Sequence, residues 1–172
     1  KIYNDVHAYV GLVFIVVTVM FAIEIYCDFS GYSDIAIGCA RLFGIDLMTN
    51  FKSPYFSFSV KEFWSRWHIS LSTWFRDYVY IPLGGNRVPR WRNCLNLLVT
   101  FLVSGFWHGS SLTYILWGGI HGVLQVIETF VYPKKRKGEE VRRRKHWWQL
   151  PLTFTLLCFT WIFFRANSIQ DA

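Results

Sequence analysis

One histidine, His108, lies in a stretch of the chain that carries no charged residue. Residues 93–127 contain no Asp, Glu, Lys or Arg, and His108 sits there within Ser104-Gly-Phe-Trp-His-Gly-Ser-Ser111. An ionisable side chain at membrane depth costs free energy, so it usually serves a function. Burial would keep this imidazole neutral and able to accept a proton as a general base. A core histidine hydrogen-bonded to a neighbouring helix fits the same residues.

A second histidine, His68, lies in the aromatic and charged segment 50–92, which does not read as a membrane span. Ser59-Val-Lys-Glu62 fits a capping box, and apolar residues follow it at helical spacing: Phe63, Trp67, Leu71, Trp74 and Tyr78. The pattern predicts one amphipathic helix in the membrane interface, ended by Ile81-Pro82 and a turn at Gly84-Gly85. His68 would lie on the flank of its apolar face, either as part of a site or only as an interfacial side chain.

Two carboxylates, Asp28 and Asp34, enclose Phe-Ser-Gly-Tyr-Ser. They could position a polar substrate group or cap helices, and capping is favoured. We expect them to break the first span, with a short helix resuming over residues 35–43 and closing at Gly44.

No metal or cofactor motif is present. The four cysteines are scattered singly and read as small buried apolar side chains: Cys27, Cys39, Cys94 and Cys158. The chain has no Gly-rich phosphate loop, no Gly-x-Ser-x-Gly elbow and no His-Glu-x-x-His. We expect no bound cofactor and no metal; His108 and His121 would face opposite sides of a continuous helix, which disfavours joint metal binding.

The composition is that of a membrane protein. Apolar residues make up 53% of the 172 residues and charged residues only 17%, below the usual quarter of a soluble domain. The excess of 18 Lys and Arg over 11 Asp and Glu lies beside apolar runs, where positive cytoplasmic loops explain it better than a nucleic-acid surface does. The sequence therefore predicts a bilayer partner and no nucleic acid.

Apolar runs and one basic loop indicate the topology. The runs are residues 8–27, 95–106, 111–132 and 147–164. Eight Lys or Arg in residues 134–145 mark the cytoplasmic side, so runs 95–106 and 111–132 would form a hairpin with both ends there. We expect an all-α, polytopic membrane protein, with residues 1–172 as one partial membrane domain and His108 lining a cavity at a broken helix.

Four motifs resemble the membrane-bound O-acyltransferase family. They are Phe29-Ser-Gly-Tyr-Ser-Asp34, Glu62-Phe-Trp-Ser-Arg-Trp-His-Ile-Ser-Leu-Ser72, Ser104-Gly-Phe-Trp-His-Gly109 and Leu116-Trp-Gly-Gly-Ile-His-Gly122. The match is dense in the middle of the chain and is similar to the bacterial alginate O-acetylation branch, with teichoic acid D-alanyl transfer more distant. Family members are longer, so the resemblance implies a fragment covering the catalytic half, without the amino-terminal spans.

The resemblance implies a site made by both histidines, since the two signature positions of the family map to His68 and His108. His108 would be the general base, while His68 would orient the donor thioester or polarise its carbonyl. Trp64, Trp67 and Trp74 would wall the pocket, with Trp107 beside the base. Arg66, Arg76 and Arg87 would face donor phosphates.

The implied reaction moves an acyl group, expected to be acetyl, from a cytoplasmic thioester to a hydroxyl reached from the other side. The donor would be acyl-coenzyme A or an acyl carrier thioester. The acceptor would be an extracytoplasmic polysaccharide or a relay residue on a polysaccharide-modifying partner protein, at the cell membrane. Three alternatives stay open: D-alanyl transfer to teichoic acid, a transporter whose histidines relay protons, and a scaffold for a secreted enzyme.

Overall fold

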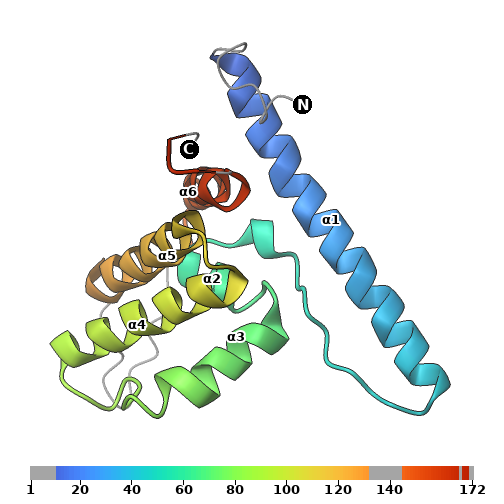
Figure 1. Ribbon diagram of the computed structural model, residues 1–172, viewed down its shortest axis with the longest axis horizontal. Coiled ribbons are helices and arrows are strands. Elements are labelled where there is room, and N and C mark those ends of the chain that lie inside the picture. Colours follow the sequence, from blue (N-terminus) through green and yellow to red (C-terminus); the bar gives the residue numbers. More distant parts are fainter. Residues whose placement is uncertain (1–10, 132–144, 167, 171–172) are drawn as a thin grey trace.

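The computed structural model of the protein describes residues 11–131, 145–166 and 168–170, which form helices and linkers with no strand among them (Figure 1). The all-α expectation is confirmed. The basic segment 134–145 lies outside the described residues except for Lys145. In chain order the elements are α1 (Leu12–Leu42), η3 (Pro54–Phe56), α2 (Val60–Trp64), α3 (Ile69–Phe75), η4 (Arg76–Tyr80), α4 (Arg90–His108), α5 (Leu112–Val131) and α6 (Gln149–Arg165).

Helix α1 runs unbroken through the segment where we expected a break. Its 31 residues correspond to about 46 Å at a rise of 1.5 Å per residue. Asp28 and Asp34 are exposed on this helix, and Ser30 donates to the Cys27 carbonyl within it. The expected break was wrong because no Pro interrupts the run, and polar side chains on an exposed face leave the backbone bonds intact.

Gly44 ends α1 as expected. It adopts φ +72°, and the N–H groups of Gly44 and Ile45 donate to the carbonyls of Arg41 and Ala40. This is the Schellman pattern, in which a glycine in the left-handed region closes the last turn. The expected burial of the cysteines was wrong for Cys27 and Cys39, which are exposed on α1.

The expected single helix from residue 59 to residue 80 is broken at His68. The capping box is present, since Ser59 Oγ accepts from Glu62 N–H at 3.1 Å, but α2 ends at Trp64. Asn50 then accepts from Ile69 N–H and, through its side chain, from Ser70 N–H. The one-helix prediction was wrong because these bonds to a distant linker replace the continuing helical ladder.

Helices α4 and α5 form the expected antiparallel hairpin (Figure 1). Each of them also carries buried polar side chains. Buried polar residues follow one stripe of each helix: Asn93, Asn96, Thr100 and Ser104 on α4, and Thr113, His121 and Gln125 on α5. Large apolar side chains of both helices, such as Phe106 and Phe130, are exposed. A hairpin with polar groups buried inside and apolar groups exposed outside is suited to a lipid environment.

The two helices approach closely at Gly105 and Gly118. A Cβ added at Gly118 would clash with the Phe101 carbonyl, and one at Gly105 would clash with the Tyr114 carbonyl. Small residues at a crossing of this kind let the backbones pack together without side chains between them.

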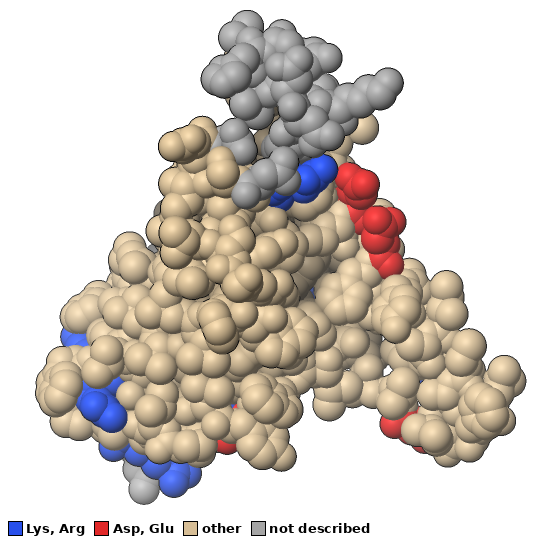
Figure 2. Space-filling model, in the orientation of Figure 1, with Lys and Arg blue, Asp and Glu red and all other residues tan. Residues whose placement is uncertain are grey.

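Helix α6 completes an aromatic core. Its Trp161 stacks on Trp117 of α5 at a centroid separation of 6.1 Å, and it packs against Trp67 at 5.2 Å. Helices α1 and α5 are long and apolar enough to cross a membrane, and α6 is a shorter apolar helix. Figure 2 shows that most of one face of the molecule is uncharged, with Lys and Arg gathered towards its lower edge.

Candidate active site

His108 is the last residue of α4 and packs inward. Its half-buried ring lies edge-on to Trp117 of α5, 5.1 Å between centroids, and to Phe164 of α6 at 5.4 Å. Gly109 follows it, and a Cβ there would come within 2.6 Å of the Tyr114 ring. Three helices therefore fix the position of this imidazole, and the small residue after it lets α5 begin close by.

His68 occupies the break between α2 and α3 in a left-handed conformation, φ 43° and ψ 56°. Such a conformation is uncommon outside glycine, although histidine adopts it more readily than most residues. Its ring lies edge-on to Phe29 of α1 at 4.6 Å, and Ser70 Oγ is 3.4 Å from its Nδ1. Burial lowers the pKa of His68 to about 4, so the ring is neutral near pH 7.

One aromatic cluster links these two histidines, which are forty positions apart in the chain. Trp67, the neighbour of His68, packs on Trp161 at 5.2 Å, and Trp161 stacks on Trp117, which contacts the His108 ring. Among the described residues, no three His, Cys, Asp or Glu side chains come together as a metal site would require.

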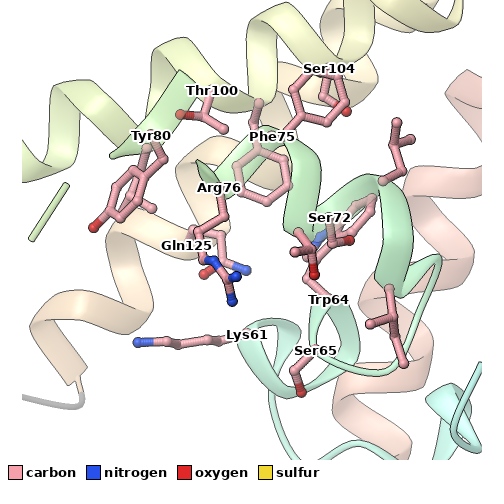
Figure 3. A pocket seen from close by; sticks show the side chains of 15 residues that line it. Lys61, Trp64, Ser65, Ser72, Phe75, Arg76, Tyr80, Thr100, Ser104 and Gln125 are labelled. Atoms are coloured by element: carbon pink, nitrogen blue, oxygen red, sulfur yellow. The ribbon is translucent and has the colours of Figure 1, made fainter. Parts of the chain in front are cut away.

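A cavity of about 360 Å³ lies between the segment from α2 to η4 and the hairpin of α4 and α5 (Figure 3). Its lining is mostly apolar and comes from α2, α3, η4, α4 and α5. Neither His68 nor His108 is among the lining residues, so the expectation that His108 lines a cavity does not hold for this one. Ile69, next to His68, and Ser104, one turn before His108 on α4, both line it.

Two exposed cations, Lys61 of α2 and Arg76 of η4, belong to the lining of the cavity. Figure 3 shows them with Gln125 of α5, which is buried, around the cavity. Arg76 also pairs with exposed Asp77 at 2.8 Å. Two cations at the entrance of a mainly apolar space fit a ligand with an anionic end and an apolar or neutral arm.

The remaining candidates fall in different places. Trp64 lines the cavity, whereas Trp67 is a core residue that is 4% exposed. Arg66 pairs with Glu62 at 2.7 Å and is not among the lining residues. Trp107 lies next to His108 and is 58% exposed, with its ring edge-on to Phe75.

Glu62 is held ionised by its surroundings. Burial raises the pKa of its carboxyl, but the Phe58 N–H and the Lys145 ammonium, which lies 3.0 Å away, lower it further than burial raises it. The Glu62 carboxylate thus fixes Arg66 and Lys145 on the outer side of α2.

Sequence reasoning missed Lys61, Ser104 and Gln125 as cavity residues. Ser104 had a signal, because it precedes His108 by four positions and so shares its helix face. Gln125 had a weaker signal as a polar residue within an apolar run. Lys61 had none, since its place at the opening depends on how α2 packs.

His121 was expected to face away from His108, as on one continuous helix. The chain instead breaks after His108, and both histidines contact Trp117, whose ring lies 5.0 Å from that of His121. His121 is fully buried, and its Nδ1 accepts from Trp64 Nε1 at 3.2 Å.

Comparisons with known proteins show which enzymes the chain is similar to. The chain is 46% identical over 149 residues to the probable alginate O-acetylase of Pseudomonas aeruginosa, covering 87% of this chain and 28% of that protein. It is 41% identical over 152 residues to the peptidoglycan O-acetyltransferase of Helicobacter pylori, covering 88% of this chain and 28% of the relative. It is 38% identical over 132 residues to the teichoic acid D-alanyltransferase of Streptococcus thermophilus, covering 73% of this chain and 32% of that protein.

The chain therefore spans less than a third of the length of each of these relatives. The family model of the membrane-bound O-acyltransferases matches residues 2–169, which is nearly the whole chain. The resemblance drawn from the four motifs is thus confirmed, and the chain belongs to the membrane-bound O-acyltransferase family.

Proposed function

We propose that this chain carries the acyl-transfer centre of an O-acetyltransferase, with His108 as the general base. The observation that carries the proposal is a cavity lined by Ile69, the neighbour of His68, and by Ser104, one turn before His108, with the cations Lys61 and Arg76 also in its lining. Membership of the family and the two O-acetylating relatives support the same reaction.

The chemistry follows from the low nucleophilicity of a hydroxyl group. An alcohol is a poor nucleophile near neutral pH, and a positioned imidazole removes its proton as the oxygen attacks. The acceptor oxygen forms a bond to the thioester carbonyl carbon, the carbon–sulfur bond breaks, and the proton passes through His108 to the leaving thiolate. His68, neutral near pH 7, would orient the donor or donate a hydrogen bond to its carbonyl oxygen.

The cavity is suited to the donor. Lys61 and Arg76 would bind phosphate oxygens of acyl-coenzyme A or of a phosphorylated carrier arm, as cations do in charge-assisted hydrogen bonds. Trp64 and Phe75 would line the path of the neutral arm. Arg87 would join Lys61 and Arg76 in binding the donor phosphates. Trp67 would support the cavity wall from the core and would not touch the substrate.

The acceptor would approach from the opposite side of the membrane. The alginate and peptidoglycan relatives are named for polysaccharide acetylation, which supports an extracytoplasmic sugar hydroxyl or a relay residue on a partner protein. In this proposal the protein is a multi-pass component of the cell membrane, and the basic loop 134–145 lies on the cytoplasmic side.

A direct test uses full-length protein with labelled acetyl-coenzyme A and a labelled acetyl carrier thioester, each with a polysaccharide acceptor. We expect His108→Ala to lower ester formation by about a hundredfold or more. The matched control is His146→Ala, because His146 is exposed and stacks only on Trp148 among the ring contacts of described residues. Equal product from wild type and His108→Ala would reject the assignment of the base.

D-Alanyl transfer is a second candidate, favoured by the 38% identity to a teichoic acid D-alanyltransferase. The same assay with a D-alanyl carrier thioester and teichoic acid separates the two reactions. Solute passage that persists in His108→Ala, with no ester formed by wild type, would instead support a transporter. Partner binding that survives loss of both His68 and His108, with acyl transfer intact, would support a scaffold.

A further inference from the structure

Four residues on one face of α5 point towards the cavity side of the molecule: Trp117, His121, Gln125 and Glu128. Their spacing of four, four and three positions places them on one helical stripe. Trp117 contacts His108, Gln125 lines the cavity, and the other two bind α2. A single stripe of α5 therefore touches both the candidate base and the cavity wall.

Glu128 holds the first turn of α2. Its Oε1 accepts from Val60 N–H at 2.6 Å, and its Oε2 accepts from Lys61 N–H at 3.0 Å. Both N–H groups lie in the first turn of the helix and have no carbonyl partner inside it. One carboxylate of α5 thus satisfies two backbone donors of α2, which lie 68 and 67 positions before it in the sequence.

His121 holds the other end of α2. Trp64 is the last residue of that helix, and an indole N–H can only donate, so His121 Nδ1 must be the unprotonated acceptor. The neutral ring then carries its proton on Nε2, which has no hydrogen-bond partner among the described residues. The imidazole lies between Trp64 and Trp117 in ring contacts of 5.1 Å and 5.0 Å.

We propose that His121 and Glu128 are positioning residues that clamp α2 to α5 at both ends and so fix Lys61 and Trp64 at the cavity. This inference rests on the proposed function for its kinetic consequence, because the cavity is taken as the donor site. Its structural part depends only on the hydrogen bonds between α2 and α5. A five-residue helix has little stability of its own, so tertiary contacts must set its place.

The structural part is tested by hydrogen exchange on the full-length protein in lipid nanodiscs. Glu128→Ala should speed exchange of residues 60–64 by about tenfold or more, since hydrogen bonds to a charged acceptor are among the stronger ones. Helices α1 and α6 should keep their wild-type exchange. Glu24→Gln is the matched control, because Glu24 is exposed on α1.

The kinetic part is tested with the same variants and labelled donor. His121→Ala and Glu128→Ala should raise the KM for the donor by about tenfold while kcat falls by much less, as expected when binding and not the chemical step is weakened. His121→Asn should stay within about threefold of wild type, because its side-chain oxygen can take the place of Nδ1 as acceptor for Trp64.

The outcomes separate this proposal from the proposed function. Unchanged exchange at residues 60–64 in both alanine variants would overturn the clamp, whatever the enzyme activity. A His121→Asn protein as impaired as His121→Ala would also overturn it, because the imidazole itself would then be required. If α2 loses its exchange protection in the alanine variants but the wild-type protein forms no ester, the clamp is supported and the proposed function is rejected.

Discussion

At the scale of single residues, each of the two candidate histidines lies at a break or at an end of a helix. His68 sits in the left-handed region between α2 and α3, and His108 is the last residue of α4 before Gly109. A side chain at a helix break or end can be aimed independently of the rotation that packing imposes on the helix. This explains how α3 packs by Phe75 while His68 turns towards Phe29 of α1.

The protonation of His68 gives a pH prediction. Its pKa is lowered by burial to about 4, from 6.5 when exposed, so the unfolded chain binds more protons between these values. The stability that His68 contributes is complete above pH 6.5 and is lost as pH falls towards 4. Melting temperatures should therefore fall more steeply over this range in wild type than in His68→Asn, a substitution that tolerates the same backbone conformation. His146→Asn serves as the control, and parallel curves for wild type and His68→Asn would contradict the prediction.

The cations at the cavity opening give a second prediction. Lys61→Gln and Arg76→Gln should each raise the KM for a phosphorylated donor by about tenfold, because each removes a charge-assisted hydrogen bond. A donor analogue shortened to the acylated thiol, without phosphates, should show no such difference. Arg41→Gln, at the exposed end of α1, is the control variant. An equal KM change for both donors would argue against phosphate binding.

At the scale of elements, sequence patterns located the apolar helices but not the breaks within polar segments. Apolar runs predicted the places of α1, α5 and α6, because lipid-facing helices need continuous apolar length. The spacing of apolar residues from Phe63 to Tyr78 also fitted one continuous helix, which the structure does not contain. The break depends on the linker that precedes η3: Asn50 accepts from the Ile69 and Ser70 N–H groups, and Lys52 N–H donates to the Arg66 carbonyl. No local sequence pattern indicates bonds of this kind.

The crossing of α4 and α5 gives a prediction at this scale. Gly118→Ala should destabilise the protein by roughly 1–3 kcal/mol, because its Cβ would meet the Phe101 carbonyl and force the helices apart. Gly31→Ala, in open space on α1, should be neutral or stabilising by up to about 1 kcal/mol. Thermal unfolding in a fixed detergent measures both. A Gly118→Ala protein as stable as Gly31→Ala would show that the crossing tolerates separation.

At the scale of the whole molecule, the resemblance named the two histidines and two of the cavity residues, Trp64 and Arg76. The rest of the cavity could not be predicted, because Lys61 and Gln125 both line it as a result of the packing of α2 on α5. Composition, which is 53% apolar, predicted a membrane protein but not the polar stripe inside the hairpin. Which polar residues face inward follows from the packing.

The hairpin of α4 and α5 predicts the orientation of the protein in the membrane. In full-length protein with its native cysteines replaced, a cysteine at position 137 should react with a membrane-impermeant maleimide only when the cytoplasmic face is opened. A cysteine at position 110, in the turn between α4 and α5, should show the opposite accessibility or react with neither side if the turn is buried in lipid. Reaction of position 137 in intact cells would reverse the proposed orientation.

The inward polar stripe of α4 also bears on biogenesis. Asn93 and Asn96 bond to Tyr80 and to the Leu83 and Gly85 carbonyls, which come before α4 in the chain, but α5, which packs along α4 beside Ser104 and Gly105, is synthesised later. A ribosome-bound α4 offered to the translocon before α5 would present the hydroxyls of its inner face, such as that of Ser104, to hydrocarbon, which disfavours its release. The insertion machinery should therefore retain α4 until α5 emerges and then hand both helices to the bilayer in one step.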